Sequence, residues 1–174
     1  MVAIPLSAMT IYKSSGTADI VAPAFFLEFE MRPLPRLKVI PGVRAEYTSY
    51  VSQLTAEPRL TAFYELVKPL LLKGSVGLYH DLPMLLFFGS DVGNPRLHLE
   101  QAWQYYLGLE WKAHEDVNLT FDLFYKDVGE MATRTTATAV RDGKTVPLIY
   151  ANQGRGRAYG AEVLLRHEPG RYFF

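Results

Sequence analysis

Apolar and polar residues alternate strictly in the middle of the chain, and this is its clearest structural signal. From Trp103 to Trp111 every second residue is large and apolar, and after a break at Ala113–Asp116 the alternation resumes over Val117–Tyr125. A period of two predicts β-strands, because successive side chains of a strand point to opposite faces of its sheet. The short break between the two runs predicts an antiparallel hairpin.

The two faces of this predicted hairpin differ in chemistry. One face has aromatic residues at its ends and aliphatic residues in its middle, whereas the other is polar and charged. Membrane β-barrels turn such an apolar face to lipid and place aromatic girdles at the two interfaces, and their tilted strands need about 9–11 residues. A soluble sheet would bury this face instead, and the hairpin alone leaves that alternative open. On the membrane alternative, the expected membrane-facing girdle is Trp103, Tyr105, Trp111, Tyr125 and Tyr159.

The composition narrows the class of protein. The 174 residues include 18 basic and 18 acidic ones, so no excess of basic charge points to nucleic acid, and no cysteine is present for disulfide or thiolate chemistry. Aromatic residues make up 13% of the chain, yet no apolar run approaches the roughly 18 residues of a membrane helix. A membrane protein without such a run must be a barrel, since only helices and closed barrels satisfy every backbone group in lipid.

Weaker alternation predicts further strands on both sides of the hairpin. Pro41, inside one of them, should mark a bulge or a position without a backbone donor. The predicted strands are Pro5–Lys13, Ile20–Arg32, Arg36–Tyr50, Pro58–Val67, Leu70–His80, the two hairpin strands (the second running toward Ala132), Tyr150–His167 and the start of a ninth at Arg171–Phe174. We therefore predict an all-β fold, with about eight strands of an antiparallel up-and-down transmembrane β-barrel.

The predicted connections alternate in length. Short ones fall at Pro33–Pro35, Lys68–Pro69, Ala113–Asp116 and Glu168–Gly170, and longer ones at Ser14–Asp19, Val51–Glu57, Asp81–Glu100 and Thr133–Ile149. Outer-membrane barrels sort their connections in this way, with short periplasmic turns and longer extracellular loops. Single-chain bacterial barrels also have even strand numbers. The begun ninth strand therefore predicts that residues 1–174 are one partial barrel domain of a longer protein, whose export signal lies upstream.

Several motifs resemble those of TonB-dependent outer-membrane receptors. Gly93–Leu97 (GNPRL), Glu100 and Tyr105–Glu110 (YYLGLE) are similar to the family's GNP-x-L turn, its Glu and its Y-x-LG-x-E strand, and Leu123–Asp127 (LFYKD) is similar to its F-Y-x-x-D. Ala151–Gly154 and Ala158–Glu162 look like its N-x-G and YG-x-E signature, and Gly42–Arg44 and Lys73–Gly77 resemble earlier strands. The resemblance covers about residues 20–174, and the order and spacing of the motifs make it specific.

The resemblance implies a 22-stranded barrel with an N-terminal plug domain in the outer membrane of a Gram-negative bacterium. Outer-membrane lipid would surround it, and a TonB complex, acting through an N-terminal part that this chain lacks, would supply energy. The cargo would be a scarce small molecule, such as an iron–siderophore, a vitamin or an oligosaccharide. One departure is the apolar run Leu82–Phe88, where the family usually has a polar extracellular loop. This run could cover the sheet edge or contact a partner.

The polar face supplies the candidate functional residues. They could form the wall of a hydrated lumen with cross-strand ion pairs of about 0.2–1 kcal/mol each, or a substrate path or plug-docking surface. The expected lumen-facing residues are Glu28, Glu30, Arg44, Glu46, Lys73, Glu110, Lys112, Asp122, Glu162 and Arg166.

Enzyme chemistry finds no support in the sequence. The four histidines are not at metal-ligand spacing, and no serine lies in a nucleophile elbow. Gly154–Arg157 has the look of a phosphate loop but lacks the Lys-Ser/Thr that would follow. His80 beside Asp81 could touch a ligand or form an exposed pair at a loop end. We expect no catalytic residue, cofactor or metal.

Two other functions stay open at this level. A self-contained eight-stranded anchor or adhesion barrel would need its first and last strands to pair. A soluble lipocalin-like barrel would need Trp103, Leu107, Leu109 and Trp111 to line a cavity. The receptor segment predicts an open curved sheet, whose unpaired edges promote aggregation and make the isolated segment insoluble without detergent.

Overall fold

The computed structural model describes residues 19–88, 94–136, 138–141, 143–147 and 149–167, and these are almost entirely β-strand. The elements are β1 (Ala24–Glu28), β2 (Met31–Leu34), β3 (Leu37–Thr48), β4 (Gln53–Val67), β5 (Leu70–Asp81), the 3₁₀ turn η2 (Leu85–Phe88), β6 (Glu100–His114), β7 (Val117–Arg134), β8 (Thr138–Arg141), β9 (Lys144–Pro147) and β10 (Tyr150–His167). Across these ranges no helix has the length and apolar character needed to cross a membrane. The expected strands Pro5–Lys13 and Arg171–Phe174 and the turn Glu168–Gly170 lie outside the described residues.

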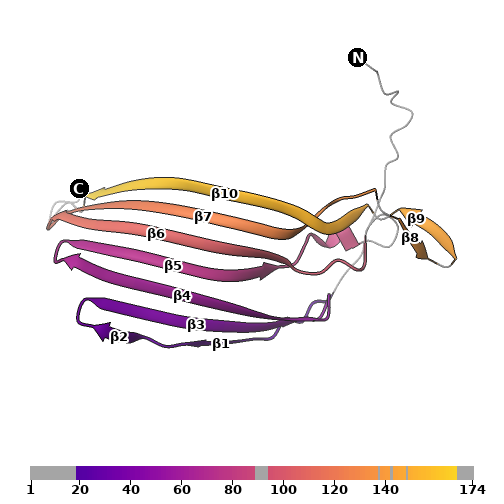
Figure 1. Ribbon diagram of the computed structural model, residues 1–174, viewed down its shortest axis with the longest axis horizontal. Coiled ribbons are helices and arrows are strands. Elements are labelled where there is room, and N and C mark those ends of the chain that lie inside the picture. The colour runs from indigo at the N-terminus through magenta and orange to yellow at the C-terminus, as the bar shows by residue number, and fades with distance from the viewer. Residues whose placement is uncertain (1–18, 89–93, 137, 142, 148, 168–174) are drawn as a thin grey trace, which may run out of the picture.

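Eight of the strands form one antiparallel sheet. Its order is β1-β3-β4-β5-β6-β7-β10, and β2 pairs with β3 in line with β1. Strands β8 and β9 form a separate hairpin, which projects beyond one end of the long curved sheet (Figure 1). In the described part of the chain β1 and β10 are each paired on one side only, so the sheet is open. The predicted all-β, antiparallel up-and-down arrangement of a barrel segment is confirmed.

The break between β1 and β2 lies opposite Pro41. The Pro41 carbonyl accepts a hydrogen bond from the Phe29 N–H at 3.0 Å, but proline has no N–H to return. In an antiparallel pair the N–H and C=O of a residue face the same neighbour, so the pairing of Pro41 with Leu60 of β4 continues without a shift. Pro41 is thus the position without a donor that we predicted, whereas one continuous strand over Ile20–Arg32 is wrong.

The connection between β3 and β4 is shorter than predicted. Val51–Glu57 is not a loop, because β4 begins at Gln53 and only Ser49–Ser52 remain between the strands, with Ser52 at a φ of 53°. Thr55 and Glu57 suggested a loop because they are polar. They are polar because they lie on the polar face of a strand, in alternation with apolar neighbours.

Other boundaries differ less. The turn predicted at Pro33–Pro35 is shifted to Pro35–Arg36, since β2 includes Pro33 and Leu34. The connection Thr133–Ile149 contains the β8–β9 hairpin, with Gly143 at a φ of +74° at its tip. The predicted strand Tyr150–His167 coincides with β10. Only two connections in the described part of the chain are therefore long: the one from β5 to β6 and the one from β7 to β10.

The strand registers divide the sheet into two faces, because residues directly opposite in neighbouring strands share a face. Tyr105 is opposite Tyr125, and Tyr125 is opposite Tyr159; their side is called the apolar face. On the other side, called the polar face, Glu162 is opposite Asp122. Asp122 is opposite Gly108, which is opposite Lys73.

The buried apolar side chains lie outside the strands. Among the described residues the buried hydrophobic ones are Phe88, Leu97 and Leu99, all in the connection from β5 to β6. The backbone N–H of Leu99 donates to Oε1 of Gln53, a residue on the polar face of β4, at 3.1 Å. The small core therefore sits where this connection crosses the polar face, near the end of the sheet beside the β8–β9 hairpin.

Candidate functional site

The ten polar candidates share one face of the sheet. Opposite pairs such as Arg44 with Glu57, Lys73 with Gly108, and Glu162 with Asp122 place them on the polar face. The residues are Glu28, Glu30, Arg44, Glu46, Lys73, Glu110, Lys112, Asp122, Glu162 and Arg166. The structure brings several of them into contact, in two networks along the sheet.

One network joins β5, β6 and β7. The ammonium group of Lys73 forms an ion pair with Glu110, whose Oε1 also accepts a hydrogen bond from Nδ2 of Asn118 at 3.0 Å. Beside them the Tyr106 hydroxyl donates to Oδ1 of Asp122 at 2.5 Å. The side chains of Lys73, Glu110 and Asp122 are thus held by neighbours on this face.

Gly108 makes room for the Tyr106 contact. A Cβ atom at Gly108 would lie 2.3 Å from the Tyr106 hydroxyl oxygen and 2.5 Å from Oδ1 of Asp122. Only a residue without a side chain lets the tyrosine lie across the strand toward Asp122. The glycine in the YYLGLE motif therefore has a local packing reason.

A second network surrounds Glu57 of β4, which is only 6% exposed. Its carboxylate lies 3.9 Å from Nε of Arg44, 3.8 Å from Nη2 of Arg59 and 3.4 Å from Nδ1 of His80, and it accepts the His80 backbone N–H at 2.8 Å. Arg44 also forms an ion pair with Glu46. A buried carboxylate needs such partners, because an unpaired buried charge is strongly unfavourable.

A small cavity adjoins this cluster. It has a volume of about 140 Å³ and is lined in part by Thr48, Thr55, Glu57, His80 and Leu99. The expectation of an exposed pair at the end of β5 is wrong for His80, whose side chain is 13% exposed and contacts Glu57. Nδ1 of His80 is buried without a hydrogen-bond partner.

The apolar run Leu82–Phe88 packs across the end of the sheet. The ring of Phe87 stacks on Tyr150 at the start of β10, with centroids 4.2 Å apart. The ring of Phe88 meets Tyr50 of the β3–β4 turn edge-on at 5.0 Å. The run thus bridges two distant parts of the sheet.

Two of the motifs noted in the sequence meet in this connection. Nδ2 of Asn94, in the GNP-x-L motif, donates to the Tyr150 carbonyl at 3.0 Å. Asn152, in the N-x-G motif, accepts the His98 N–H through Oδ1 and donates to the His98 carbonyl through Nδ2, each at 3.0 Å. Both asparagines therefore anchor the connection against β10.

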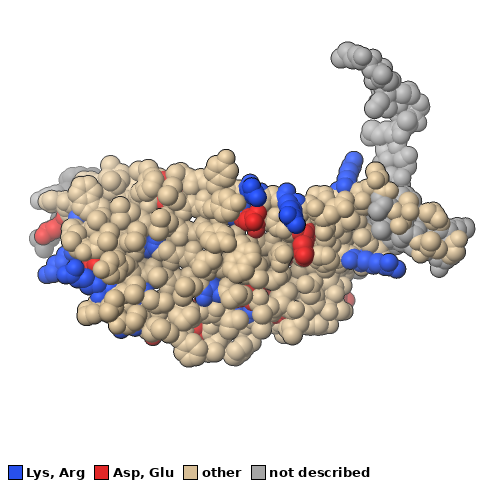
Figure 2. All heavy atoms as spheres, viewed as in Figure 1, with Lys and Arg blue, Asp and Glu red and all other residues tan. Residues whose placement is uncertain are grey.

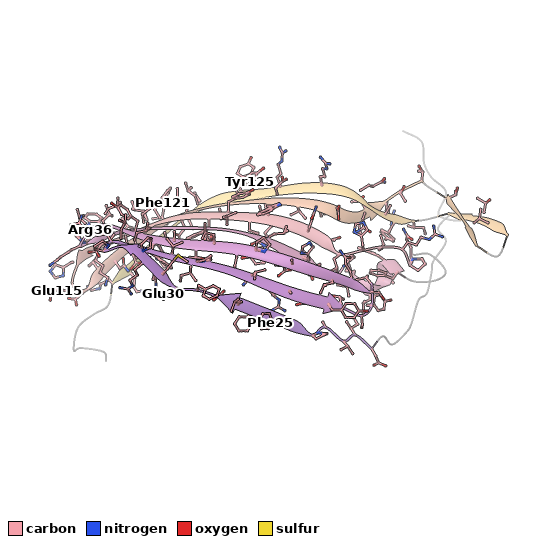
Figure 3. All side chains as sticks on the ribbon, turned by 60° about the horizontal axis from the view of Figure 1, so that its bottom comes forward. Phe25, Glu30, Arg36, Glu115, Phe121 and Tyr125 are labelled. Carbon is pink, nitrogen blue, oxygen red and sulfur yellow. The ribbon has the colours of Figure 1, made fainter. Side chains whose placement is uncertain are left out.

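The five predicted girdle residues lie together on the apolar face. Trp103 is 40%, Trp111 46% and Tyr159 78% exposed, and Tyr125 stands out from the sheet in Figure 3. Trp103 and Trp111 lie eight residues apart on β6. At about 3.3 Å per residue and the tilt of about 40° found in barrels, this is about 20 Å along a barrel axis. The lipocalin-like alternative is wrong about these residues, since Trp103, Leu107 and Trp111 are on the exposed side.

Glu57 and Arg59 are the residues that sequence reasoning missed. Neither residue is among the predicted lumen-facing residues. Glu57 is excluded because the sequence predicts a loop at Val51–Glu57. The alternation of Thr55, Glu57 and Arg59 with less polar neighbours was the available signal. In the described ranges no group of three or more histidine, aspartate or glutamate side chains is arranged to hold a metal ion.

Comparisons with known proteins agree with this architecture. A search of curated proteins found no match. Among solved structures, the siderophore receptor PirA from Acinetobacter baumannii superposes with a TM-score of 0.70 at 17% identity, covering 86% of this chain and 26% of the receptor. The ferric enterobactin receptor of Pseudomonas aeruginosa superposes with a TM-score of 0.67 at 17% identity, covering 83% of this chain and 24% of the receptor. The outer membrane transporter YddB from Escherichia coli superposes with a TM-score of 0.66 at 14% identity, covering 83% of this chain and 21% of the transporter.

The chain thus spans about a quarter of the length of these receptors and shares their fold. A family model for the TonB dependent receptor-like β-barrel matches residues 4–173. This match takes in nearly the whole chain, including every strand of the open sheet and the networks on its polar face. The chain therefore belongs to the TonB-dependent receptor family, as a segment of its β-barrel.

Proposed function

We propose that the protein to which this chain belongs is an outer-membrane receptor that imports a scarce solute with energy from a TonB complex. The supporting observation is the combination of an exposed apolar face with aromatic ends and a polar face crossed by an anchored connection. The apolar face would contact outer-membrane lipid, and the polar face would line the lumen. Residues 1–174 would be part of the barrel domain, with the plug and the remaining strands outside this chain.

An iron–siderophore is the first candidate cargo, followed by a vitamin or an oligosaccharide. The family is one of transport receptors, and two of the structural neighbours are named for siderophores. On the polar face the guanidinium group of Arg59, whose side chain is 29% exposed, lies next to the buried carboxylate of Glu57. Donors of this kind could pair with the oxygen atoms of an anionic chelate.

The proposal is tested by solute uptake in the native bacterium. Cells with the gene disrupted are compared with the parent for uptake of radiolabelled ferric siderophores, a vitamin and an oligosaccharide, with and without a functional TonB complex. The expected result is loss of uptake of one solute class in both the gene disruption and the TonB-deficient cells. Unchanged uptake of every solute, or uptake that does not depend on TonB, would contradict the proposal.

Variants of the full protein connect the result to the polar face. Arg59→Gln should lower the affinity for an anionic solute, while Lys68→Gln, in the β4–β5 turn at the other end of the sheet, serves as the matched control. Equal uptake by both variants would show that the cluster around Glu57 lies off the solute path.

A further inference from the structure

A cavity lined by residues of β6, β7 and β10 lies on the side of the sheet away from the proposed lumen. Its volume is about 520 Å³. The register between β7 and β10 shifts on both sides of Gly154, and Glu130 of β7 has a φ of 56°. Such bulges interrupt the regular cover of side chains, and the cavity opens at this place.

Two arginines of β10 face this cavity. Arg157 is opposite Asp127, and two residues further along the same strands Tyr159 is opposite Tyr125 on the apolar face. Arg155 lies two residues before Arg157 and also lines the cavity. At about 3.3 Å per residue, the arginines lie about 7 and 13 Å beyond the Tyr159 position, toward the end of the sheet that carries the β8–β9 hairpin.

The arginines are available to a ligand. Within the described residues Arg155 makes no hydrogen bond or ion pair. Nε of Arg157 lies 3.6 Å from Oδ1 of Asp127, with the two side chains 72% and 53% exposed, and such an exposed pair is weak. Figure 2 shows basic and acidic side chains gathered near this end of β7 and β10, on a face with few charges across its middle.

Trp103 adds the second half of the site. It lines the same cavity. Its ring stacks with that of Tyr105 at a centroid distance of 6.5 Å, and the ring centroids of Tyr105 and Tyr125 are 6.0 Å apart. Tryptophan and tyrosine on a membrane-facing surface sit at the level of the lipid headgroups. The cavity therefore combines guanidinium groups with an aromatic edge at the depth where a lipid phosphate lies.

We propose that Arg155 and Arg157 bind the phosphate of a membrane-lipid headgroup in this cavity, with Trp103 against the adjoining acyl chains. This inference rests on the proposed placement of the apolar face in the outer membrane. Guanidinium groups match phosphate oxygens with paired hydrogen bonds, and basic pockets beside membrane segments bind lipid headgroups. Asp127 competes with the phosphate for Arg157 and so limits the affinity.

The test is native mass spectrometry of the full protein in a neutral detergent. The probes are dioleoyl phosphatidate, dioleoylglycerol with the same chains but no phosphate, and inorganic phosphate. The protein should retain phosphatidate about tenfold better than dioleoylglycerol, Arg155→Gln should lower this about fivefold, and Asp127→Asn should raise it several-fold because Arg157 is released. Lys126→Gln, next to Asp127 in β7 but on the polar face, removes one positive charge at the same level and should change nothing.

Each outcome decides the matter. Equal retention by Arg155→Gln and the unaltered protein, or equal retention of both lipids, overturns the site. Displacement of phosphatidate by millimolar inorganic phosphate identifies a free-anion site instead of a lipid site. Solute uptake by the Arg155→Gln variant is measured in cells in parallel. No selective retention of phosphatidate by the unaltered protein, together with normal uptake, contradicts this site alone. Normal retention without uptake of any solute contradicts the proposed transport function alone.

Discussion

Asn152 of β10 holds the backbone of His98 with both ends of its amide group. Oδ1 accepts the His98 N–H and Nδ2 donates to the His98 carbonyl, each at 3.0 Å, across 54 residues of sequence. Nδ2 also donates to the carbonyl of Glu130, at the irregular point of β7, at 2.7 Å. The connection from β5 to β6 has no strand partner at His98 among the described residues, and the Asn152 side chain supplies the hydrogen bonds that a strand would. Asn152 thus fixes this connection to β7 and β10.

Replacing Asn152 with alanine should release this connection. The His98 N–H would lose its partner, and each lost hydrogen bond is worth about 0.5–1.5 kcal/mol net. We expect faster hydrogen exchange at His98 and Leu99 and a lower unfolding temperature of the full protein in detergent. Gln153→Ala, the next and more exposed residue, is the control. Equal exchange in the two variants would show that other contacts hold the connection.

The positions of the strands were more predictable from the sequence than the side-chain contacts between strands. The period of two identified β6, β7 and β10, because on these strands the two faces differ strongly in polarity along the whole length. At the start of β4 the same alternation is present but weaker, because Thr55 and Glu57 alternate with residues that include Ala56 and Pro58, so the segment resembles a polar loop. The partners of Glu57 come from β3, β4 and β5, and no spacing along one strand encodes that arrangement.

Residue pairs far apart in sequence were also beyond prediction. The motifs around Asn94 and Asn152 were visible, but not their shared contact with the connection and β10. The apolar run Leu82–Phe88 could not be assigned from its own letters, because its role depends on Tyr50 and Tyr150. Local patterns specify local structure, whereas these contacts depend on sheet order.

A methyl group at Gly108 should disrupt the polar face. In Gly108→Ala the new Cβ would lie 2.3 Å from the Tyr106 hydroxyl oxygen, so the tyrosine must move and its hydrogen bond to Asp122 is lost. Overpacking of this kind costs about 1–3 kcal/mol, to be measured by thermal unfolding in detergent. The double variant Tyr106→Ala/Gly108→Ala removes the contact with the tyrosine and leaves space into which the Asp122 carboxylate, 2.5 Å from the new Cβ, can turn. The glycine change should therefore cost less in that background. Equal cost in both backgrounds would reject this explanation.

A charge on the apolar face should be costly only if that face meets lipid. Leu107, midway between Trp103 and Trp111, is 50% exposed. Lysine at the midplane of a membrane barrel costs about 2–4 kcal/mol, so Leu107→Lys should lower the free energy of unfolding in lipid bilayers by that amount. Thr120→Lys, on the polar face opposite Glu110, should change it by less than about 1 kcal/mol. A larger loss for Thr120→Lys would reverse the assignment of the faces.

Neutralising Glu57 should destabilise the sheet locally. In Glu57→Gln the guanidinium groups of Arg44 and Arg59 lose the buried carboxylate they share, and breaking a buried pair from one side costs about 3–5 kcal/mol. The polar face is partly hydrated, so we expect the lower end, seen as a reduced unfolding temperature. Glu65→Gln, on the same face of the same strand, should leave stability nearly unchanged. Similar effects of the two changes would mean that the cluster contributes little.

Labelling of introduced cysteines can determine which end of the sheet faces outward. Val140 of β8 is 70% exposed, and Glu115, in the turn between β6 and β7, lies at the opposite end of the sheet (Figure 3). Longer connections of outer-membrane barrels are extracellular and short turns are periplasmic. The chain has no cysteine of its own, so Val140→Cys and Glu115→Cys each introduce one thiol into it. In intact cells a membrane-impermeant maleimide should label the first variant and not the second, and after the outer membrane is opened it should label both. Labelling of Glu115→Cys alone in intact cells would invert the orientation, and labelling of neither before or after opening would place the protein outside the outer membrane.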